Sequence, residues 1–457
     1  MVIMSFIRKI VPERSFIRLS WHYAKAFVAA AINGFSARKL TVVAITGTDG
    51  KTTTVGMIHH ILMSSGRRVG SASTAFVQVM NEKEENETHL TSLSPFVLQK
   101  FLKRLVKEKC EYAVIEASSH GLVQGRLNYA YPSVSGVTNV TSEHLDYHKS
   151  IEQYRKDKGK LFEMLKGRGV KVLNGGDKSM KKYLNIESEE TVVYSLRSPR
   201  PSPELVEGRV ERGPLDVRCE RTLEESYDFW LSDISANEFT TSAKIHRGEE
   251  VFDLELNIPG IFNLENALCA ISCASSVGIP INECIESLEN FKSLPGRMER
   301  IDEGQKFNAF VDFAVSSNSY RKTLETLQKI VGENGRVMVL CSSCGNRMKE
   351  KRPEIGKIAS ECADVVVVTE DETYGEDPMK VLEEVWSGIN QSITEAHKIE
   401  DRKEGIRFLV KNAREGDAIV FCGMGPFSTM NKLEGSIEWD ERKVVREIIS
   451  EEISNEH

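Results

Sequence analysis

The sequence predicts an α/β protein in which a central P-loop domain, built on a doubly wound and mostly parallel sheet, precedes a C-terminal Rossmann-like α/β domain. Three observations lead to this fold class. A glycine-rich turn directly follows the apolar run at residues 41–45. Short apolar runs then alternate with longer segments of helical periodicity. After Ser293-Leu-Pro-Gly296 the same alternation starts again and continues to Cys422.

Composition limits the classes of protein to consider. A chain of 457 residues, 40% hydrophobic and 28% charged, is long enough for two or three globular domains. Its net charge of −7 argues against nucleic acid as a partner. The nine cysteines are irregularly spaced, which indicates a reducing compartment rather than a disulfide framework. Cys341 and Cys344 form one CxxC without a second pair, so no zinc or redox site is expected there.

Residues 1–40 are expected to form an N-terminal helical segment. Their most apolar part, residues 24–35, is too short for a transmembrane helix and contains Lys25. No small-residue cleavage site follows an apolar core, so a signal peptide is not expected. Packing of an amphipathic helix on the next domain is the preferred interpretation, and weak contact with a membrane surface is the alternative. The basic residues among the large apolar ones are Arg8, Lys9, Arg14 and Arg18.

The glycine-rich turn reads Thr46-Gly47-Thr48-Asp49-Gly50-Lys51-Thr52-Thr53-Thr54. A strand that breaks into glycines and then a helix leaves backbone N–H groups unpaired at the helix N-terminus, which suits a polyphosphate. Lys51 would add a charge at the outer phosphates, and the Thr52 hydroxyl would add a Mg²⁺ ligand. Only two residues separate Gly47 from Gly50, where the general motif has four. A chance turn before a helix is the alternative, but the pattern favours binding of a nucleoside triphosphate.

Two further strands of the central domain end in polar residues. Helical patterns at residues 55–65 and 95–109 precede a strand at 112–116, which ends at Glu116. A second strand, at 134–140, leads into Thr141-Ser142-Glu143-His144. Ligands of parallel sheets bind beyond the carboxyl ends of the strands. Both strand ends and the P-loop are therefore expected to meet in one crevice.

The remaining elements complete the two domains, residues 41–292 and 293–457. Residues 196–216 hold four prolines among arginines and glutamates, and predict a flexible insertion without chemistry. A strand at 252–258 and a small-residue helix at 266–276 close the central domain. In the C-terminal domain the pattern predicts strands at 309–313, 336–341, 364–369 and 418–422, and helices at 319–331, 353–362 and 378–389.

With these segments in order, the chain resembles the Mur ligases, the ATP-dependent amide-forming enzymes of peptidoglycan precursor synthesis, and most closely their muramoyl-tripeptide synthetase branch. The motifs that carry the resemblance follow the family order over residues 41–446. They are Gly47-Thr-Asp-Gly-Lys-Thr-Thr53, Glu116-Ala-Ser-Ser-His-Gly-Leu-Val-Gln-Gly-Arg126, Thr138-Asn-Val-Thr-Ser-Glu-His-Leu-Asp-Tyr-His148, Tyr154-Arg-Lys-Asp-Lys-Gly-Lys-Leu-Phe162, Phe262-Asn-Leu-Glu-Asn266, Leu294-Pro-Gly-Arg-Met-Glu-Arg300, Lys351-Arg-Pro353 and Ala363-Asp-Val-Val-Val-Val-Thr369.

The resemblance implies ATP and two Mg²⁺ ions as cofactors. Thr52 and Glu116 would hold one Mg²⁺, and His144 would help to hold the second. Lys158 matches the family lysine that becomes carbamylated, although its basic neighbours alone would favour a solvated helix lysine. The implied catalytic residues are Lys51, Glu116, His144, Lys158 and Arg297. The implied nucleotide-binding residues are Gly47, Thr48, Asp49, Gly50, Lys51, Thr52, Thr53, Asn263, Asn266, Arg297, which reaches the phosphates, and Asp312, which contacts the ribose.

The acceptor substrate would lie against the motif that follows Glu116. The implied residues are Ser118, Ser119, His120, Gln124 and Arg126; for His120, a structural role in the turn is nearly as well supported. The P-loop begins at residue 46, so the family's N-terminal UDP-binding domain is expected to be missing.

Three C-terminal motifs depart from the family. The Asp-Asn-Pro-Arg/Ala stretch becomes Asp371-Glu-Thr-Tyr374, Gly-Lys-Gly-His-Glu becomes Gly423-Met-Gly-Pro-Phe427, and Tyr-Ala-His becomes Phe313-Ala-Val315. Residues that would select a diamino acid such as diaminopimelate are therefore mostly absent. The sequence favours a different amine, or a pocket that uses Arg347, Asp371, Glu372 and Tyr374.

The expected function is a cytoplasmic ATP-dependent ligase that adds an amino acid to a UDP-N-acetylmuramoyl peptide or a similar carboxylate through an acyl phosphate. Its expected partners are small molecules. One alternative is a ligase like the folylpolyglutamate synthases, acting on another acceptor. A second alternative is a nucleotide-binding subunit without ligase activity, which the altered C-terminal motifs would suit.

Overall fold

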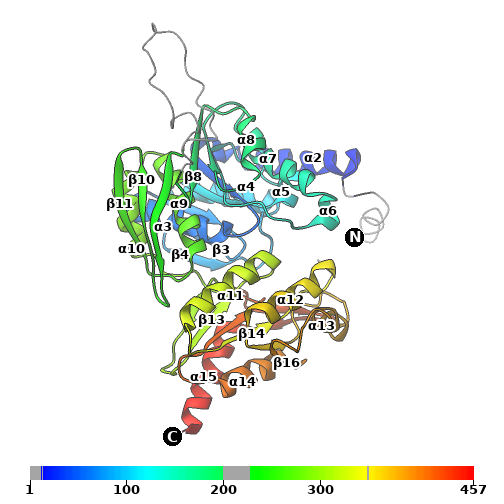
Figure 1. The fold of residues 1–457 in the computed structure, drawn as a ribbon. Helices are drawn as coiled ribbons and strands as arrows, with labels where there is room; N and C mark the ends of the chain where they lie inside the picture. The colour runs from blue at the N-terminus through cyan, green and yellow to red at the C-terminus, as the bar shows by residue number, and fades with distance from the viewer. Residues whose placement is uncertain (1–11, 13, 199–226, 347–348, 457) are drawn as a thin grey trace, which may run out of the picture.

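The computed structural model describes residues 12, 14–198, 227–346 and 349–456. Two β-sheets with helices on both faces form two units, drawn one above the other in Figure 1. The first unit contains an 11-stranded sheet and the second a six-stranded sheet. The predicted α/β fold class, with a mostly parallel sheet followed by a second sheet domain, is confirmed.

The first sheet has the strand order β11-β10-β9-β8-β7-β6-β1-β5-β2-β3-β4. The strands from β9 to β2 in this order are parallel, and antiparallel strands extend both edges. The strands are β1 (Thr41–Thr46), β2 (Val69–Ala72), β3 (Phe76–Val79), β4 (Glu82–Glu85), β5 (Tyr112–Ala117), β6 (Pro132–Val137), β7 (Val170–Asn174), β8 (Glu190–Ser195), β9 (Phe229–Ala236), β10 (Thr241–Arg247) and β11 (Glu250–Leu256). The helices are α2 (Phe16–Ile32), η1 (Ser36–Lys39), α3 (Lys51–Ser64), α4 (Pro95–Lys107), α5 (Ser119–Val123), α6 (Leu145–His148), α7 (Ile151–Glu163), α8 (Met180–Leu184), α9 (Ile261–Ser275) and α10 (Ile281–Glu289).

Strand β1 lies inside the sheet and is buried on both faces. Val43 and Ile45 belong to a core with α3, α9 and α10, while Val42 and Ala44 belong to a core with α4 on the other face. Side chains of a strand alternate between the two faces, so a strand covered on both sides needs an unbroken apolar run. This requirement explains why the sequence alone located β1.

The chain reverses its direction of winding across the sheet at β1. Its parallel neighbours are β5, where Glu116 pairs with Ile45, and β6, where Val137 pairs with Thr46. Crevices at such switch points are the usual ligand sites of open α/β sheets. The P-loop, Glu116 and the loop after β6 lie at this one edge, as the sequence predicted.

Some predicted boundaries were wrong for local reasons. Strand β6 ends at Val137 and not at residue 140, because Thr138 and Asn139 turn to the P-loop: Thr138 Oγ1 donates to Asp49 O at 2.6 Å, and Asn139 Oδ1 accepts from Asp49 N at 3.0 Å. Helix α9 starts at Ile261, five residues before the predicted helix. The predicted flexible insertion at 196–216 lies outside the described residues from residue 199 onward.

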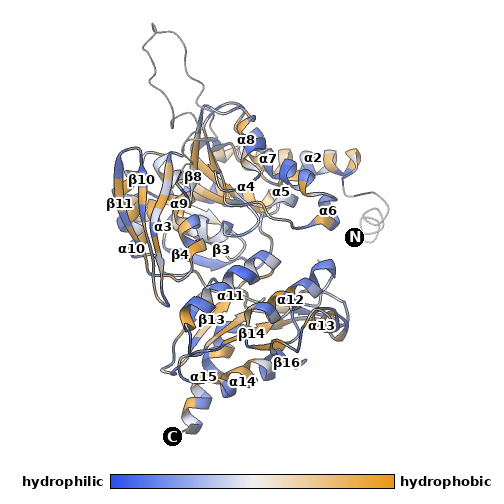
Figure 2. Ribbon diagram, viewed as in Figure 1, coloured by the Kyte–Doolittle hydropathy of each residue, from blue (hydrophilic) through white to orange (hydrophobic). Residues whose placement is uncertain are grey.

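The second unit has the strand order β12-β13-β17-β14-β15-β16, with only β12 antiparallel to its neighbour. Figure 2 shows hydrophobic residues along β13 and β14 between helical layers. Its strands are β12 (Glu299–Ile301), β13 (Asn308–Asp312), β14 (Val337–Cys341), β15 (Val365–Val368), β16 (Glu395–Lys398), β17 (Ala418–Cys422) and the hairpin β18 (Thr429–Lys432) and β19 (Gly435–Glu438). Its helices are α11 (Ser317–Val331), η3 (Lys349–Lys351), α12 (Arg352–Cys362), α13 (Pro378–Trp386), α14 (Arg402–Asn412) and α15 (Glu441–Glu456).

Helix α3, which follows the P-loop, contains a buried histidine with a consequence for stability. Burial lowers the pKa of His59 to about 4, although its Nε2 lies 3.0 Å from Met80 O. Histidine in an unfolded chain titrates near 6.5, so the unfolded state binds more protons between pH 4 and 6.5. The free energy of unfolding should therefore rise with pH across that window, by about 3 kcal/mol at 1.4 kcal/mol per pKa unit. Denaturant unfolding at pH 4.5 and 7 should show this rise in the wild-type chain and a smaller one in His59→Gln.

Helix α2 covers part of the first unit next to α4. Ser15 caps its first turn by accepting a hydrogen bond from Arg18 N, and Ala26, Ala29 and Ala30 are buried. The predicted helix in residues 1–40 is thus confirmed in its described part. Among the described residues we find no helix whose length and apolarity would let it span a bilayer.

Candidate functional site

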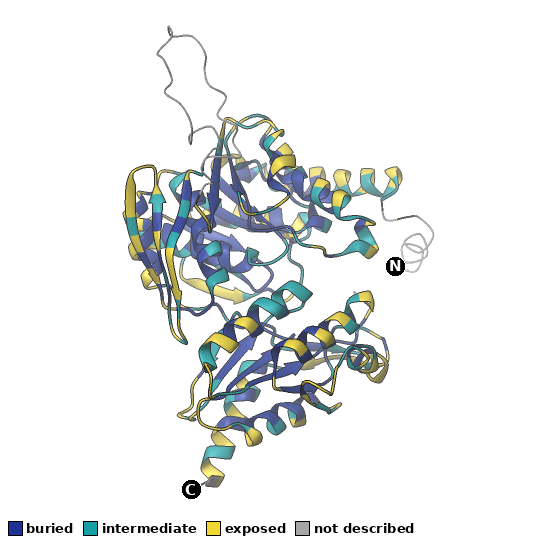
Figure 3. Cartoon of the chain, viewed as in Figure 1, coloured by how far each residue is buried: buried dark blue, intermediate teal, exposed yellow. Residues whose placement is uncertain are grey.

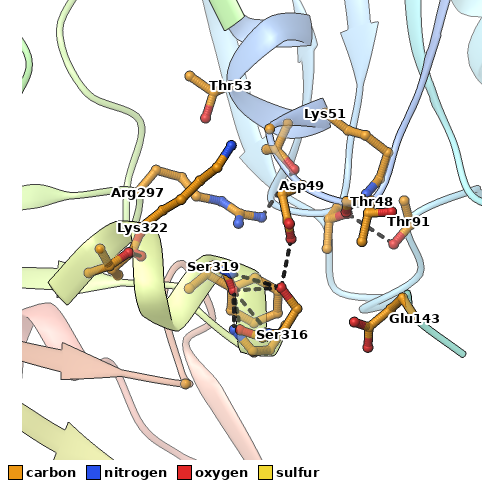
Figure 4. Close-up of a pocket in the computed structure, with 18 of the residues that line it drawn as sticks. Thr48, Asp49, Lys51, Thr53, Thr91, Glu143, Arg297, Ser316, Ser319 and Lys322 are labelled. Carbon is orange, nitrogen blue, oxygen red and sulfur yellow. Dashed lines mark hydrogen bonds between the residues drawn. The ribbon is translucent and has the colours of Figure 1, made fainter. Parts of the chain in front are cut away.

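A cavity of about 250 Å³ lies between the two units. Its walls come from the P-loop and α9 of the first unit, and from α11 and the loops after β13, β14, β15 and β17 of the second. Figure 4 shows the P-loop residues facing Arg297, Ser316 and Lys322 across it. The predicted site residues that line it are Thr48, Asp49, Gly50, Lys51, Thr52, Thr53, Glu116, His144, Asn263, Asn266, Arg297, Asp312, Asp371, Glu372 and Tyr374.

The other predicted site residues that the structure describes do not line this cavity. Arg347 lies outside the described residues. Gly47 belongs to the P-loop, and Lys158 lies behind this loop, where its amine donates to the Gly47 carbonyl oxygen. Those expected on the acceptor side are grouped near α5; they are Ser118, Ser119, His120, Gln124 and Arg126.

The P-loop has two glycines because neighbouring side chains press against it. A Cβ atom on Gly47 would lie 1.8 Å from Thr138 Oγ1, and one on Gly50 would lie 2.1 Å from Asn266 Oδ1. Gly50 also has a φ of +81° at the start of α3, which other residues rarely adopt. The short spacing between these glycines is therefore compatible with a tight loop at a helix N-terminus, where anions bind.

Glu116 and Thr52 form the polar centre of the cavity. Thr52 Oγ1 donates to Glu116 Oε2 at 3.0 Å, and Thr74 donates to the same carboxylate from its backbone N–H at 2.8 Å and from its hydroxyl at 3.1 Å. Lys51 Nζ lies 3.9 Å from Glu116 Oε1 and donates to Thr48 O at 2.8 Å. One hydroxyl, one carboxylate and one ammonium group thus meet at the N-terminus of α3.

Arg297 reaches this centre from the second unit. Its Nη2 donates to Thr52 Oγ1 at 3.1 Å, and its guanidinium lies 4.6 Å from the centre of the Phe313 ring. Burial lowers its pKa, an effect that Glu116, Asp312 and other acids oppose. Arg297 is partly buried and its Nε has no hydrogen-bond partner among the described residues, so this cation is suited to receive an anionic ligand.

The residues present fit a magnesium ion. Mg²⁺ is commonly held by one or two carboxylates together with phosphate oxygens and water. Glu116 and Thr52 offer such oxygens next to the anion-binding helix N-terminus. Among the described residues no three His, Cys, Asp or Glu side chains are grouped as a metal site, so phosphate and water would have to complete the coordination.

Lys158 is buried, which excludes the solvated alternative considered for it. Its side chain is 1% exposed, donates to Gly47 O and lies 4.5 Å from the centre of the Tyr154 ring. Burial lowers its pKa well below the usual lysine value, and the nearby Lys51 lowers it further. Burial therefore favours the neutral form of this amine, which is held against the back of the P-loop.

His144 and Glu143 continue the cavity wall after β6. Burial, together with the neighbouring His120 and Lys158, lowers the pKa of His144 well below its usual range. Lys351 of the second unit donates to the Glu143 carboxylate and, at 2.8 Å, to Ser142 O. Burial raises the pKa of Glu143, and Lys351 opposes that rise. The loop after β6 is thus also a contact between the units.

Asp49 makes a second contact between the units. Its Oδ1 accepts from Ser316 Oγ at 3.0 Å, and its Oδ2 accepts from Asn318 Nδ2 at 2.8 Å, at the start of α11 (Figure 4). Lys322 of the same helix donates to Glu265 of α9 at 3.3 Å. The P-loop is therefore held directly by the second unit.

Asp312 is buried in the wall between these contacts. Its carboxylate accepts hydrogen bonds from Met298 N at 2.9 Å and from Thr323 Oγ1 at 2.8 Å. Burial raises the pKa of Asp312, and the nearby Arg297 opposes that rise. Asn266 donates to Asn263 Oδ1 at 3.2 Å beside the P-loop. These side chains border the part of the cavity next to α11.

At another part of the wall, the altered C-terminal motifs form a hydrogen-bonded group. Tyr374 and Asn431 each donate to the Glu372 carboxylate at 2.6 Å, and His89 Nδ1 lies 3.6 Å from it. Burial alone would raise the pKa of Glu372, but these hydrogen bonds outweigh it and lower the pKa. The His89 ring stacks on Phe427 at 3.9 Å between centroids.

Asp371 stands beside this group, where it accepts from Ser342 Oγ at 2.6 Å. Burial raises the pKa of Asp371, although Arg402 opposes the rise. The stretch Asp371-Glu-Thr-Tyr374 contains no lysine or arginine, so this part of the cavity wall presents acidic and hydroxyl groups.

The residues near α5 form a connected group behind the cavity. Ser118 caps α5 by accepting from Gly121 N at 3.1 Å, so its hydroxyl has a structural role here. His148 lies 3.0 Å from Ser119 Oγ and 2.7 Å from Asp157 Oδ2. His120 packs against the rings of His144, Tyr147 and His148.

Several lining residues were not predicted as site residues. Glu143 stands next to His144 within a quoted motif and could have been found there. Thr74 and His89 lie in short segments without a helix or strand pattern, and Lys322 is one of several polar residues on α11. Lining residues that were not predicted include Thr74, His89, Glu143, Glu265, Ser316, Lys322 and Phe427.

Comparison with known protein families accounts for both units. The Mur ligase middle domain matches residues 45–274. The Mur ligase, glutamate ligase domain, matches residues 296–425. The first match begins within β1 and contains the P-loop and the other ten strands of the first sheet, and the second match contains all six strands of the second sheet.

Individual relatives cover nearly the whole chain. The UDP-N-acetylmuramoyl-L-alanyl-D-glutamate--2,6-diaminopimelate ligase of Trichormus variabilis is 31% identical over 439 residues, 94% of this chain and 81% of that protein. The UDP-N-acetylmuramyl-tripeptide synthetase of a Roseiflexus species is 30% identical over 446 residues, 94% of this chain and 82% of that protein.

Two solved structures have a fold similar to that of this chain. A UDP-N-acetylmuramoyl-L-alanyl-D-glutamate--2,6-diaminopimelate ligase shares 25% identity and a TM-score of 0.59, covering 92% of this chain and 79% of that one. The MurF ligase of Thermotoga maritima in complex with ADP has the same fold, with a TM-score of 0.63 at 18% identity over 94% of this chain and 85% of that one. The two family matches, the relatives and the arrangement of the P-loop between two α/β units lead to one conclusion: the chain belongs to the Mur ligase family.

Proposed function

We propose that this protein is an ATP- and Mg²⁺-dependent acid–amino-acid ligase that adds an amino acid to a UDP-N-acetylmuramoyl peptide in cytoplasmic peptidoglycan precursor synthesis. One observation carries the proposal: the P-loop and Glu116 of one unit meet Arg297 of the other at the Thr52 hydroxyl. The relatives named above bear the names of such ligases. The proposed domains are residues 1–40, 41–292 and 293–457.

The chemistry follows from the charges at the junction. A carboxylate is a poor electrophile, so its oxygen first attacks the γ-phosphorus of ATP, which forms an acyl phosphate and releases ADP. The amine nitrogen then attacks the acyl carbon, phosphate leaves, and the nitrogen loses a proton. Lys51 and Arg297 offset the negative charge that accumulates on the transferred phosphoryl group. Asp49 and Glu143, through Ser316 and Lys351, hold the second unit over the site and so limit water.

Magnesium would be held in two places. Thr52 and Glu116 would hold one ion, and His144 with a carbamylated Lys158 would hold a second. When bound, these ions supply positive charge next to the phosphates. Carbamylation joins the lysine nitrogen to the carbon of CO₂ with loss of a proton, and it needs a neutral amine. The buried amine of Lys158, with its lowered pKa, supports this assignment.

Substrate recognition is proposed for three groups of residues. Asn263, Asn266 and Asp312 would border the nucleotide, with Asp312 at the ribose. The acceptor would contact the region of Ser118, Ser119, His120, Gln124 and Arg126. Asp371, Glu372, Tyr374 and Arg347 would select the amine. The partners are small molecules, without nucleic acid, and residues 1–40 make weak contact with a membrane surface.

Phosphate release from ATP tests the function directly. The purified chain is incubated with ATP, Mg²⁺ and a panel that pairs UDP-muramoyl peptides with single amino acids. One pair should raise phosphate release by at least about a hundredfold over ATP alone, because water is a poor substitute for a positioned carboxylate as the group that attacks the γ-phosphorus. Flat release across the panel would refute the ligase and favour the alternative of a nucleotide-binding subunit.

A further inference from the structure

Most of the large apolar side chains of helix α2 face solvent, unlike those of an ordinary surface helix. Surface helices bury their large apolar residues and expose polar ones. In α2 the fully buried residues are all alanines, whereas Phe16, Ile17 and Ile32 are 85%, 74% and 66% exposed. Figure 3 shows exposed residues along much of this helix. The exposed large apolar residues of α2 are Phe16, Ile17, Trp21, Tyr23, Phe27, Val28 and Ile32, here called the α2 face.

The α2 face is continuous and carries no charge. At 100° per residue its members fall within one half of the helix circumference, together with Ser20, Ala24 and Ala31. An aromatic group extends it, because Phe27 lies 6.1 Å from Phe35 and 5.9 Å from Tyr129 between ring centroids. Contiguous apolar surface of this kind marks an interaction site on a folded protein.

Positive charge borders the same face. Lys25 and Arg18 follow directly after its edge on the helix circumference, and Lys25 Nζ lies 5.3 Å from the centre of the Trp21 ring. Beside the aromatic extension, the exposed Arg38 lies 4.9 Å from the centre of the Phe35 ring. Residues 1–40 contain seven Lys or Arg and one Glu, in a chain with a net charge of −7. The charge of this segment is thus opposite to that of the protein as a whole.

We propose that α2 is an interfacial helix that docks the protein on the surface of an anionic phospholipid bilayer. An apolar face bordered by Lys and Arg, with Trp and Tyr on it, matches the depth and charge of the lipid headgroup layer. The acidic remainder of the chain is repelled by anionic lipid, so the docked protein is oriented with α2 toward the bilayer. The proposal rests on this helix alone and not on the ligase reaction.

The helix is tied to the central unit, so docking holds the whole unit. Arg14, just before α2, donates to both oxygens of Asp157 in α7 at 2.8 and 2.9 Å. Asp157 is buried and also contacts His148. Burial alone would raise the pKa of Asp157, but the contacts with His148 and Arg14 outweigh it and lower the pKa. The carboxylate therefore stays ionised at neutral pH and keeps the start of α2 fixed.

Vesicle sedimentation of the full-length protein tests the proposal. Vesicles of equal phosphatidylglycerol and phosphatidylcholine should bind at least about tenfold more protein than phosphatidylcholine alone, and the difference should vanish in 1 M salt. The triple variant Phe16→Gln, Ile17→Gln, Trp21→Gln should bind the anionic vesicles at least about tenfold less. A matched control, Val251→Gln, Ile393→Gln, Leu433→Gln, changes three other exposed apolar residues outside α2 and should bind as the wild type does.

Three results would overturn the proposal: no binding to either vesicle, equal binding to both, or equal binding of both triple variants. Absence of vesicle binding, combined with self-association that only the α2 variant abolishes, would assign the face to a second copy of the chain. Phosphate release in solution should be the same for both triple variants. A failed ligase assay and a failed docking assay therefore remain distinguishable.

Discussion

Lys158→Ala is expected to lower ligase turnover by about three orders of magnitude, as the loss of a charged group at a phosphoryl-transfer site does. In the wild-type chain the side chain would be a carbamate, so the variant loses a metal-binding carboxylate as well as a lysine. The truncation leaves space behind Gly47, next to the Tyr154 ring. Acetate or propionate should enter that space and restore part of the activity.

Lys171 offers a matched control. It is the same residue type in the same unit, is 1% exposed, and donates to the carbonyl oxygens of Tyr183, Leu184 and Ile186. Lys171→Ala should lower the free energy of unfolding by about 1–3 kcal/mol per unsatisfied buried group, without rescue by carboxylates and with normal turnover per folded molecule. A carbon-13 NMR signal of a carbamate should appear with labelled bicarbonate in the wild type and be missing in Lys158→Ala. Unchanged turnover in Lys158→Ala would refute the carbamate.

The sequence could place the site because the topology of a parallel sheet leaves little choice. Strands β5 and β6 flank β1, so their carboxyl ends must lie beside the P-loop, and the motifs at those ends lie there with them. The burial of Lys158 could also have been predicted, although the basic residues around it in the sequence favour a solvated lysine. Tyr154, Lys158 and Leu161 recur at helical spacing and share one buried face of α7.

Contacts between distant segments could not be read from the sequence. Asp49 reads as a P-loop residue, yet its carboxylate bonds to Ser316 and Asn318 of the second unit. Thr138 still donates its backbone N–H to Thr46 O of β1, but its hydroxyl donates to Asp49 O of the P-loop, a contact that no strand pattern predicts. The α2 face was hidden for a related reason, since periodicity locates an amphipathic helix but not which side of it the protein covers.

Arg297→Ala is expected to lower kcat/KM by about a thousandfold, since an arginine at a transferred phosphoryl group is worth about 10³–10⁵ in rate. Its guanidinium is the second unit's cation at the Thr52 hydroxyl, and burial lowers its pKa despite the nearby acids. An anionic ligand would complete its partners. Without ligand, Arg297 is only partly buried and its Nε has no hydrogen-bond partner in the part of the chain that the structure describes, so its removal should shift the melting temperature by no more than about a few degrees.

Nucleotide should separate the two roles of Arg297. Adding a non-hydrolysable ATP analogue with Mg²⁺ should raise the melting temperature of the wild type, because ligand that binds only the folded state stabilises it. The rise should shrink in Arg297→Ala. Arg300→Ala is the matched control, because that guanidinium lies 4.5 Å from the Phe239 ring in the same stretch of chain but outside the cavity. If Arg297→Ala melted several degrees lower without nucleotide and kept its kcat/KM, Arg297 would be a structural link between the units rather than a phosphate ligand.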